Sequence, residues 1–487
     1  MEFTDLSFLY LWLPLTLAAY FIARKLRTKN KILLVTSLLF YAMGQPLYLL
    51  VLAGLSGLNF RLAQKILPGR RRTLILPVAI NVAVLVLLKY LDFFLGFRED
   101  GVLLSASRWL VSGLNRMGLT LKAPTGALPM GISFYTFSVV SYLADVYRGK
   151  IPAETRFSRL LLYLTMFPKM LQGPIVRYAD LAPQLRKRRT SPKDAFEGLQ
   201  RFVFGLAKKV LLADYCGQLI AEVGTIGASD TFVGAWLVGL LFFFRLYLDF
   251  SGYSDMAIGL GRIFGFTYCE NFDMPYTSVS VSEFWRRWHM SLGSFFRDYI
   301  YIPMGGSRVE WKRQILNLLA VWALTGLWHG ASWNYVIWGL YFFAILVVEK
   351  QFAEKLETLP KLARKTLTLF LVFIGWVIFA NEDLGQLGRT LAAMMGFHGF
   401  GAAGVGLKLV NALPLMAVCA IGCTSLPRWV MTYWFFICRM DRGDEETPTL
   451  WKGLYLASAV LVMAVLLWLC TVSLVGNTSA PAIYGGF

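Results

Sequence analysis

The sequence is poor in charged residues, and this excludes a water-soluble globular protein. Only 16% of the 487 residues are Asp, Glu, Lys or Arg, whereas 57% are hydrophobic. Soluble domains carry roughly 25% charged and 45–50% apolar residues. The apolar residues also form runs close to the roughly 20 residues that a helix needs to cross a bilayer. The composition therefore predicts an integral membrane protein with many transmembrane helices.

Cysteine motifs and the common catalytic motifs are missing as well. The six cysteines are scattered and form no CxxC pair, so we expect buried apolar side chains, with neither a disulfide framework nor a metal site. The sequence contains no P-loop, no GxSxG elbow and no HExxH motif. It also shows no internal repeat and no separate soluble domain. Any chemistry must therefore lie within the membrane helices.

Positive charge is in excess, since 48 Lys and Arg against 29 Asp and Glu give a net charge of +19. The basic residues lie in short clusters between apolar runs, such as 24–31 and 186–189. Such clusters are typical of cytoplasmic loops that face anionic lipid, so we expect the bilayer, and no nucleic acid, as the partner of these charges. Glu2 and Asp5 precede the first apolar run. This order argues against a cleaved signal peptide and predicts an extracytoplasmic N-terminus.

The apolar runs predict an all-α polytopic membrane protein with about 11–13 membrane segments, some of them short or re-entrant. Breaks at Pro-Met-Gly and Gly-Pro interrupt the segments 127–148 and 157–176. Broken helices at membrane depth are tolerated only where they are buried in protein or line a cavity, so these two segments are expected to surround an interior. Residues 98–123 are predicted to be partly interfacial. The expected spans are about 7–24, 32–66 as a hairpin, 74–95, 127–148, 157–176, 196–222, 231–264, 314–329, 332–352, 366–381, 405–423 and 451–475.

His329 is the strongest candidate for chemistry among only three histidines. The residues from Ile315 to Trp328 are apolar apart from Asn317 and Thr325. An ionisable side chain at membrane depth is costly and by default marks a functional site. A neutral histidine is also suited to proton transfer. The alternative is a histidine that is hydrogen-bonded within the helix bundle.

His289 lies in a polar segment, 268–312, that is rich in Trp, Arg, Tyr, Ser and Gly. On a helix, Arg286 and Trp285 are three and four residues from His289 and share its face. Arginine matches phosphate well, so the segment is predicted to bind an anionic donor such as a phosphate-bearing thioester. The alternative is an amphipathic interfacial segment anchored by Trp and Arg. His398, in a glycine-rich loop, is expected to be an ordinary interfacial histidine.

Two carboxylates, Asp249 and Asp255, lie in an otherwise apolar run close to Tyr253. Buried carboxylates need partners. We expect structural ion pairing with Arg245 or with an arginine of the segment 283–298.

Together these residues resemble the membrane-bound O-acyltransferase family, and most closely its bacterial branch for alginate O-acetylation. The motifs stand in the order of the family and span 128–339, and the flanking spans agree in character. They are LPMGISFYTFSVVSYLADVYRG at 128–149, FPKMLQGPIVRY at 167–178, DFSGYSDMAIGLGRIFGF at 249–266, NFDMPYTSVSVSEFWRRWHMSLGSFFRDYIYIPMGG at 271–306 and LTGLWHGASWNYVIWG at 324–339.

The resemblance implies one membrane domain over 1–487, built around a central tunnel in a bacterial inner membrane. We expect N-terminal helices in 1–123, the core with the active site in 124–352 and C-terminal helices in 353–487. It also implies transfer of an acyl group, here acetyl, from acetyl-CoA or a carrier-protein thioester to a hydroxyl, with no bound cofactor. The acceptor is expected to be an extracytoplasmic polysaccharide, reached through an SGNH-type partner transferase. The C-terminal SAPAIYGGF departs from the family's tail, which leaves the partner surface open.

Within the family, the residue matching His329 is regarded as essential, and His289 matches a second active-site histidine. We therefore predict that His329 is the general base on the acceptor hydroxyl. Asn334 or a nearby hydroxyl orients its ring or stabilises the oxyanion, and His289 binds or polarises the donor. The predicted supporting residues are Asn334, Arg286, Arg297, Asp249, Tyr253, Trp328 and Ser332.

Several alternatives stay open. A covalent acyl-enzyme on histidine or serine is one. D-alanyl transfer to teichoic acid, or acetylation of another wall polymer or exopolysaccharide, is a second. A membrane transporter, which also uses broken helices and membrane-depth charges, is a third.

Overall fold

The computed structural model describes residues 1–95, 112–113, 115–116, 129–438, 440 and 449–476. Within these ranges all regular structure is helical, and no strand is present. The predicted all-α membrane architecture is therefore confirmed. The interfacial segment 98–123, apart from four of its residues, and the tail 479–487 lie outside the described residues.

Five helices in the described part are long and apolar enough to cross a membrane. Two further apolar stretches, Phe8–Ile22 and Tyr48–Ala63, are shorter. Large apolar side chains face outward on the last helix, where Leu461 and Trp468 are each 64% exposed, as expected for contact with lipid. The five helices are α4 (Arg71–Leu95, of which Arg71–Leu91 forms the span), α12 (Phe232–Ile263), α18 (Lys361–Ala380), α20 (Val405–Gly422) and α22 (Thr449–Gly476).

The predicted hairpin 32–66 is broken in its middle, and the segment 157–176 is broken ahead of the Gly-Pro that was expected to interrupt it. Gln45 separates the first two long helices, and Pro46 opens the second, a position where proline is pre-organised for a helix. The segment 157–176 divides at Met166 into two short helices. The elements of this half are η1 (Phe8–Trp12), α1 (Leu13–Ile22), α2 (Leu26–Gly44), α3 (Pro46–Ala63), α6 (Ile132–Tyr147), α7 (Phe157–Thr165), α8 (Phe167–Met170) and α9 (Tyr178–Arg186).

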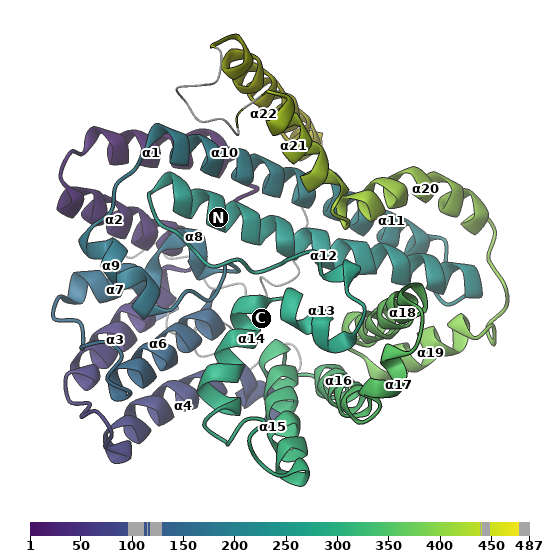
Figure 1. The fold of residues 1–487 in the computed structure, drawn as a ribbon, viewed down its shortest axis with the longest axis horizontal. Helices are drawn as coiled ribbons and strands as arrows, with labels where there is room; N and C mark the ends of the chain where they lie inside the picture. The colour runs from purple at the N-terminus through teal and green to yellow at the C-terminus, as the bar shows by residue number, and fades with distance from the viewer. Residues whose placement is uncertain (96–111, 114, 117–128, 439, 441–448, 477–487) are drawn as a thin grey trace.

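Helix α12 crosses the middle of the molecule with α10 (Pro192–Ala207) beside it (Figure 1). Glycines allow this close approach. A Cβ atom on Gly205 would lie 2.5 Å from the carbonyl oxygen of Gly252, and one on Gly198 would lie 2.6 Å from that of Gly259. Small residues at helix contacts are typical of membrane bundles. After α10 the chain continues through η2 (Lys208–Ala213) and α11 (Asp214–Thr225).

A second close contact joins α15 (Trp311–His329) to α16 (Trp333–Gln351). A Cβ atom on Gly326 would lie 2.4 Å from the carbonyl oxygen of Tyr335, and one on Gly339 would lie 2.5 Å from that of Trp322. This hairpin places His329 in the interior. The other elements are η3 (Pro275–Thr277), α13 (Val281–Arg287), α14 (Met290–Phe296), η4 (Arg297–Tyr301), α17 (Ala353–Glu357), α19 (Leu384–Met394) and α21 (Leu426–Ile437).

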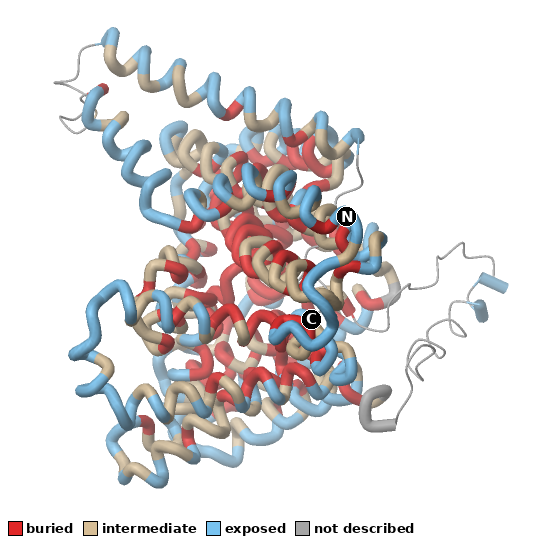
Figure 2. Tube along the Cα trace, turned by 90° about the vertical axis from the view of Figure 1, so that its right-hand side faces the viewer, coloured by how far each residue is buried: buried red, intermediate tan, exposed pale blue. Residues whose placement is uncertain are grey.

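The buried residues gather in the centre of the molecule (Figure 2). Two large apolar clusters form the core, one mainly from α1 to α10 and one from α11 to α20. A small third cluster contains Trp328 together with Phe134, Leu292 and Phe296. Both active-site histidine candidates touch this third cluster.

Candidate active site

His329 is the last residue of α15 and is only 2% exposed. The chain leaves the helix at Gly330, whose backbone is extended. Aromatic rings surround the imidazole, with centroid distances of 4.8 Å to Trp338, 4.9 Å to Trp328 and 5.2 Å to Phe379. The ring is therefore held in a water-poor pocket, where a histidine is favoured in its neutral, basic form.

Two side chains of α4 hold the helix end that carries His329. The ammonium group of Lys89 donates to the carbonyl oxygen of Trp328, and the hydroxyl of Tyr90 donates to that of Leu327. Carbonyls in the last turn of a helix have no intrahelical partner, and the negative end of the helix dipole favours a cation. Lys89 is only 7% exposed. Lys89 was not among the residues singled out from the sequence. A lysine inside an apolar span is costly, and this could have indicated its role.

His289 stands between two short helices, and the prediction of one continuous helical face is wrong. Helix α13 ends at Arg287, and His289 precedes α14 with φ 44° and ψ 52°. This left-handed conformation is uncommon for a residue other than glycine. It separates the side chain of Arg286, on α13, from that of His289. The local break follows from tertiary contacts that helical spacing does not reveal.

The side chain of Asn271 fixes the tautomer of His289. The Nδ1 atom of His289 lies 3.0 Å from Oδ1 of Asn271. That amide oxygen also accepts from the hydroxyl of Ser291 at 2.8 Å, while the amide nitrogen donates to Ser254 at 3.0 Å. Because Oδ1 only accepts, Nδ1 carries the proton. In the neutral ring the basic lone pair is then on Nε2.

Trp328 links the two histidines. Its ring centroid lies 4.9 Å from that of His329 and 5.9 Å from that of His289. Phe137 stacks on its other side at 5.5 Å. Trp328 is thus a neighbour that both imidazoles share.

Two adjoining cavities lead toward His289. The inner one, of about 170 Å³, is lined by His289 and by residues of α13, α14, η4 and α15. The outer one, of about 820 Å³, lies between α13, α16 and α18 and includes Arg286. Tyr301 and Leu318 line both cavities. A long substrate can therefore extend from the outer cavity to His289.

The outer cavity is lined by three carboxylates, Glu283, Glu349 and Glu357, and by three basic side chains, Arg286, Lys350 and Arg364. Glu349 accepts from the backbone amides of Val281 and Ser282, at 2.6 and 2.9 Å, and Glu283 pairs with Arg287 at 2.7 Å. Arg286 and Arg364 also line the cavity. No ion pair of either appears within the described residues. The cavity thus presents two arginines to an anionic ligand.

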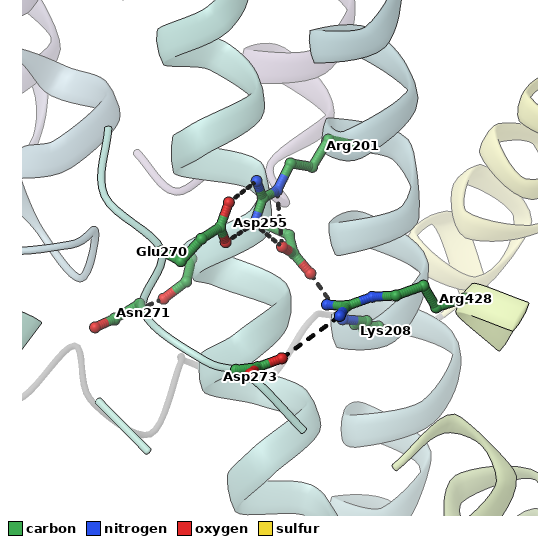
Figure 3. Close-up of polar contacts among 8 residues, drawn as sticks. Arg201, Lys208, Asp255, Glu270, Asn271, Asp273 and Arg428 are labelled. Atoms are coloured by element: carbon green, nitrogen blue, oxygen red, sulfur yellow. Dashed lines mark hydrogen bonds and ion pairs between the residues drawn. The ribbon is translucent and has the colours of Figure 1, made fainter. Parts of the chain in front are cut away.

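The loop that carries Asn271 is held on both sides by ion pairs (Figure 3). Glu270 lies 2.5 Å from Arg201, and Asp273 lies 3.5 Å from Arg428. These contacts tie the loop to α10 and to α21. They hold Asn271 at the position where it meets His289.

Comparison with known proteins identifies the chain. The sequence model of the MBOAT, membrane-bound O-acyltransferase, family matches residues 107–381. This match includes both histidines and most of the walls of the two cavities. The chain belongs to the MBOAT family.

Named relatives agree with this assignment. Over 408 residues the chain is 39% identical to a protein named probable alginate O-acetylase AlgI from Pseudomonas syringae pv. tomato, covering 82% of this chain and 76% of the relative. It is 32% identical over 434 residues to a peptidoglycan O-acetyltransferase from Helicobacter pylori, covering 80% and 79%. A teichoic acid D-alanyltransferase from Bacillus subtilis is 29% identical over 276 residues, covering 52% and 69%. This MBOAT protein is therefore an O-acyltransferase and a multi-pass membrane protein.

Asn334 and Ser332 of this acyltransferase lie beside His329 in the fold. The amide nitrogen of Asn334 is directed at the carbonyl oxygens of Ile378 and Phe379, at 3.4 and 3.2 Å. Asn334 therefore bonds to the backbone of Phe379, a residue whose ring packs on His329. The hydroxyl of Ser332 donates to the carbonyl oxygen of Glu382 at 3.1 Å.

Asp249 and Tyr253, both on α12, contact residues from other parts of the chain. The carboxylate of Asp249 lies 2.8 Å from the ammonium group of Lys209, a partner that we did not predict. Lys209 also pairs with Asp214 at 2.5 Å. The ring of Tyr253 stacks on Phe3 at 4.8 Å. The expectation that Asp249 forms an ion pair is confirmed, and the partner comes from η2.

Arg297 lines the inner cavity, but its own charge is paired. Its side chain is 64% exposed and lies 2.7 Å from Asp298. Asp298 also pairs with Arg177 at 2.6 Å. Burial alone raises the pKa of Asp298, but hydrogen bonds from the two arginines outweigh it and hold the pKa below its usual value.

Within the described ranges, no three His, Cys, Asp or Glu side chains are grouped so as to hold a metal ion. The cysteines in the same ranges are free thiols, all buried except Cys269. The residues around His289 and His329 offer aromatic rings, amides and hydroxyls in place of a metal-binding set.

Proposed function

We propose that this MBOAT protein transfers an acetyl group from a cytoplasmic thioester to a hydroxyl, for O-acetylation of an extracytoplasmic polysaccharide. The observation that carries the proposal is a pair of buried histidines that share Trp328 as a neighbour. One of them, His289, lines the inner of two adjoining cavities, and the outer cavity contains arginines. The printed activities of the relatives, alginate O-acetylase and peptidoglycan O-acetyltransferase, support an acetyl group and a polymer outside the cytoplasm.

The donor is proposed to enter through the outer cavity. Arg286 and Arg364 suit the phosphates of coenzyme A or of a carrier-protein phosphopantetheine. The thioester then reaches the inner cavity beside His289, whose Nε2 atom carries the basic lone pair of the neutral ring. The connecting end of the α15–α16 hairpin meets the acidic residue Glu382, while Lys312, Arg313 and Lys350 lie at the other end, near the outer cavity. Basic loops face the cytoplasm, which supports this direction of entry and a bacterial inner-membrane location.

The proposed chemistry is a direct transfer. Neutral His329 removes the proton from the acceptor hydroxyl as its oxygen attacks the thioester carbonyl. The tetrahedral intermediate expels the thiolate as the C–S bond breaks, and the thiolate takes up the proton that His329 removed. The acceptor oxygen then carries the acetyl group as an ester. The acceptor hydroxyl belongs either to the polymer or to an SGNH-type partner transferase that passes the group on.

Purified protein in liposomes tests this function. Acetyl-CoA labelled in the acetyl group is supplied on one side, and free thiol and acetylated acceptor are measured together. We expect His329→Ala to reduce transfer by about 10²–10⁴-fold, with an unchanged unfolding midpoint. Full transfer by His329→Ala contradicts the proposed base.

Further arms of the assay separate the alternatives. Movement of an intact solute without release of thiol identifies a transporter. Transfer from a D-alanyl thioester in preference to acetyl identifies D-alanylation. Label that stays on denatured protein identifies a covalent acyl-enzyme.

A further inference from the structure

A cationic cavity lies at the ends of α2, α7 and α9, apart from the two cavities that lead to His289. Figure 1 shows these three helices together in the N-terminal half. The cavity measures about 510 Å³. Its walls are fixed by Asn30, which donates to the carbonyl oxygen of Leu185 at 2.9 Å and accepts from Arg188 at 2.6 Å. It is lined by Leu26, Arg27, Asn30, Lys31, Leu34, Arg156, Phe157, Ser158, Arg159, Leu162, Leu185 and Arg186.

Five basic side chains line this cavity, and its lining includes no acidic residue. The nearby carboxylate of Glu154 compensates two of them, because it lies 3.3 Å from Arg159 and 3.2 Å from Arg186. The other three are Arg27, Lys31 and Arg156. No ion pair of these three is present in the part of the chain that the structure describes. The cavity therefore holds a net positive charge.

The helix ends add to this positive potential. Helix α2 begins at Leu26 and α7 begins at Phe157, and both residues line the cavity. The N-cap side chain of neither helix bonds to its own helix, and at α7 the carboxylate of Glu154 accepts from the backbone amide of the N-cap residue Arg156. The N-terminus of a helix carries a partial positive charge, which favours anions and disfavours cations. Basic residues at two such ends are unfavourable in the free protein, and a bound anion relieves the repulsion.

The cavity lining also includes apolar side chains. Leu34, Leu162 and Leu185 are among them. Along α2 the apolar surface continues through Val35 and Leu39, which are 54% and 49% exposed. A soluble phosphate makes no apolar contact with such a surface, whereas the acyl chain of a lipid can pack along it.

We propose that this cavity binds the phosphate headgroup of an anionic phospholipid, with the acyl chain lying along α2. Arg27, Lys31 and Arg156 contact the phosphate, and Leu34 and Leu162 contact the glycerol end of the chain. Basic pockets between membrane helices are suited to such headgroups. The lipid joins α2 to α7 and α9, and its binding is independent of the acyl-transfer function.

The test measures thermal unfolding of the full-length protein in detergent with added phosphatidylglycerol, cardiolipin or phosphatidylcholine. We expect the anionic lipids to raise the unfolding midpoint of the wild type and phosphatidylcholine to leave it unchanged. The double variant Arg27→Gln/Arg156→Gln loses most of this increase. Its affinity for the anionic lipid falls roughly 30-fold, since each basic residue near anionic lipid contributes about fivefold.

A matched control removes two charges elsewhere. Arg71→Gln/Arg72→Gln alters an exposed basic cluster outside the cavity and is expected to retain the full lipid-induced increase. An equal loss in both double variants overturns the proposal, because it indicates only general surface charge. If the cavity variant does not fold, the single change Lys31→Gln at the exposed rim serves instead, with Lys65→Gln as its control.

Soluble anions complete the test. Inorganic phosphate and coenzyme A are added in place of lipid. If either stabilises the wild type as strongly as cardiolipin does and competes with cardiolipin, the cavity binds a soluble phosphate, and lipid binding is contradicted. Stabilisation by an acidic carrier protein in the absence of anionic lipid contradicts it as well. Failure of acetyl transfer leaves this result unaffected, since the measurement does not involve the reaction.

Discussion

His289 combines a catalytic role proposed for its ring with an unusual backbone. Its φ of 44° lies in the left-handed region, which costs a non-glycine residue of order 1–3 kcal/mol. The contacts of Asn271 and Ser291 around the ring and the following amides compensate for that cost. Strained positions cluster at functional sites, which supports the proposal that His289 acts on the donor.

Two substitutions separate the ring of His289 from its backbone. Asn adopts the left-handed region readily, so His289→Asn is expected to keep the unfolding midpoint near that of the wild type while transfer falls at least about 10²-fold. His289→Val adds a β-branched side chain and is expected to lose about 1–3 kcal/mol of stability. Thermal unfolding and acetyl transfer are measured on both variants. Equal stability of the two variants would show that the backbone conformation is not strained.

Lys89 is predicted to position His329 without touching the substrate. Lys89→Met keeps the length of the side chain but removes the donor to the carbonyl oxygen of Trp328. A shift of the catalytic ring by about 1 Å costs about 10²-fold, so kcat is expected to fall by about 10–100-fold while KM for the thioester changes little. Lys89→Gln, which retains a donor, is expected to recover part of kcat. A change confined to KM would place Lys89 in donor binding instead.

At the scale of helices, the glycine contact between α15 and α16 sets the position of His329. Gly326 lies one turn before His329, and its Cα faces the backbone of Tyr335 with no room for a Cβ atom. The two helices therefore approach as closely as their backbones allow. Any side chain at Gly326 separates them and moves His329 away from Trp338 and Phe379.

Gly326→Ala is accordingly expected to destabilise the protein by about 1–3 kcal/mol, as overpacking does, and to lower acetyl transfer. Gly406→Ala is the matched control, since a Cβ atom there meets nothing within 4 Å on the exposed helix α20. The control is expected to be neutral or slightly stabilising, because alanine is the better helix former. Unfolding midpoints of both variants in the same detergent check this. The prediction fails if the two variants behave alike.

At the scale of the whole molecule, Glu154 joins elements that are distant in sequence. Its buried carboxylate accepts from Tyr178 at 2.6 Å, from the backbone amide of Arg156 at 2.9 Å and from Arg186 at 3.2 Å. Burial alone raises the pKa of Glu154. The hydrogen bonds and the neighbouring arginines outweigh burial and hold the pKa below its ordinary value of 4.5.

This pKa shift predicts a pH dependence of stability. A lowered carboxylate pKa stabilises the fold fully above pH 4.5, and the contribution is lost as the pH falls through the lowered pKa. Glu154→Gln is expected to lose about 1–3 kcal/mol at neutral pH and to show a flatter decline in acid. Glu197→Gln, which breaks the more exposed pair with Arg262, is expected to lose less than about 1 kcal/mol. Unfolding of each variant over a pH series measures both effects, and a wild-type slope in Glu154→Gln would contradict the assignment.

The sequence by itself determined the class, the family and the helical segments of this protein. Apolar runs and basic clusters are set by the bilayer, which acts on every residue of a span in the same way. They can therefore be recognised from short stretches of sequence. The break at Gln45 was likewise visible as the adjoining Gly44 and Pro46, whereas the break at Met166 lies ahead of the Gly-Pro that was expected to interrupt its segment. His329 was recognisable because a lone histidine in an apolar run is costly wherever the helix packs.

Only the tertiary structure decided which groups meet those residues. The pairing of Asp249 with Lys209, the hold of Lys89 on the end of α15 and the contact of Asn271 with His289 join positions far apart in the chain. The spacing of Trp285, Arg286 and His289 predicted one helical face, but the helix is broken between α13 and α14 at His289. Such contacts depend on the crossing of helices and on the distance between side chains in space. Spacing along one chain specifies which face of a helix a residue occupies, but not which residue lies opposite.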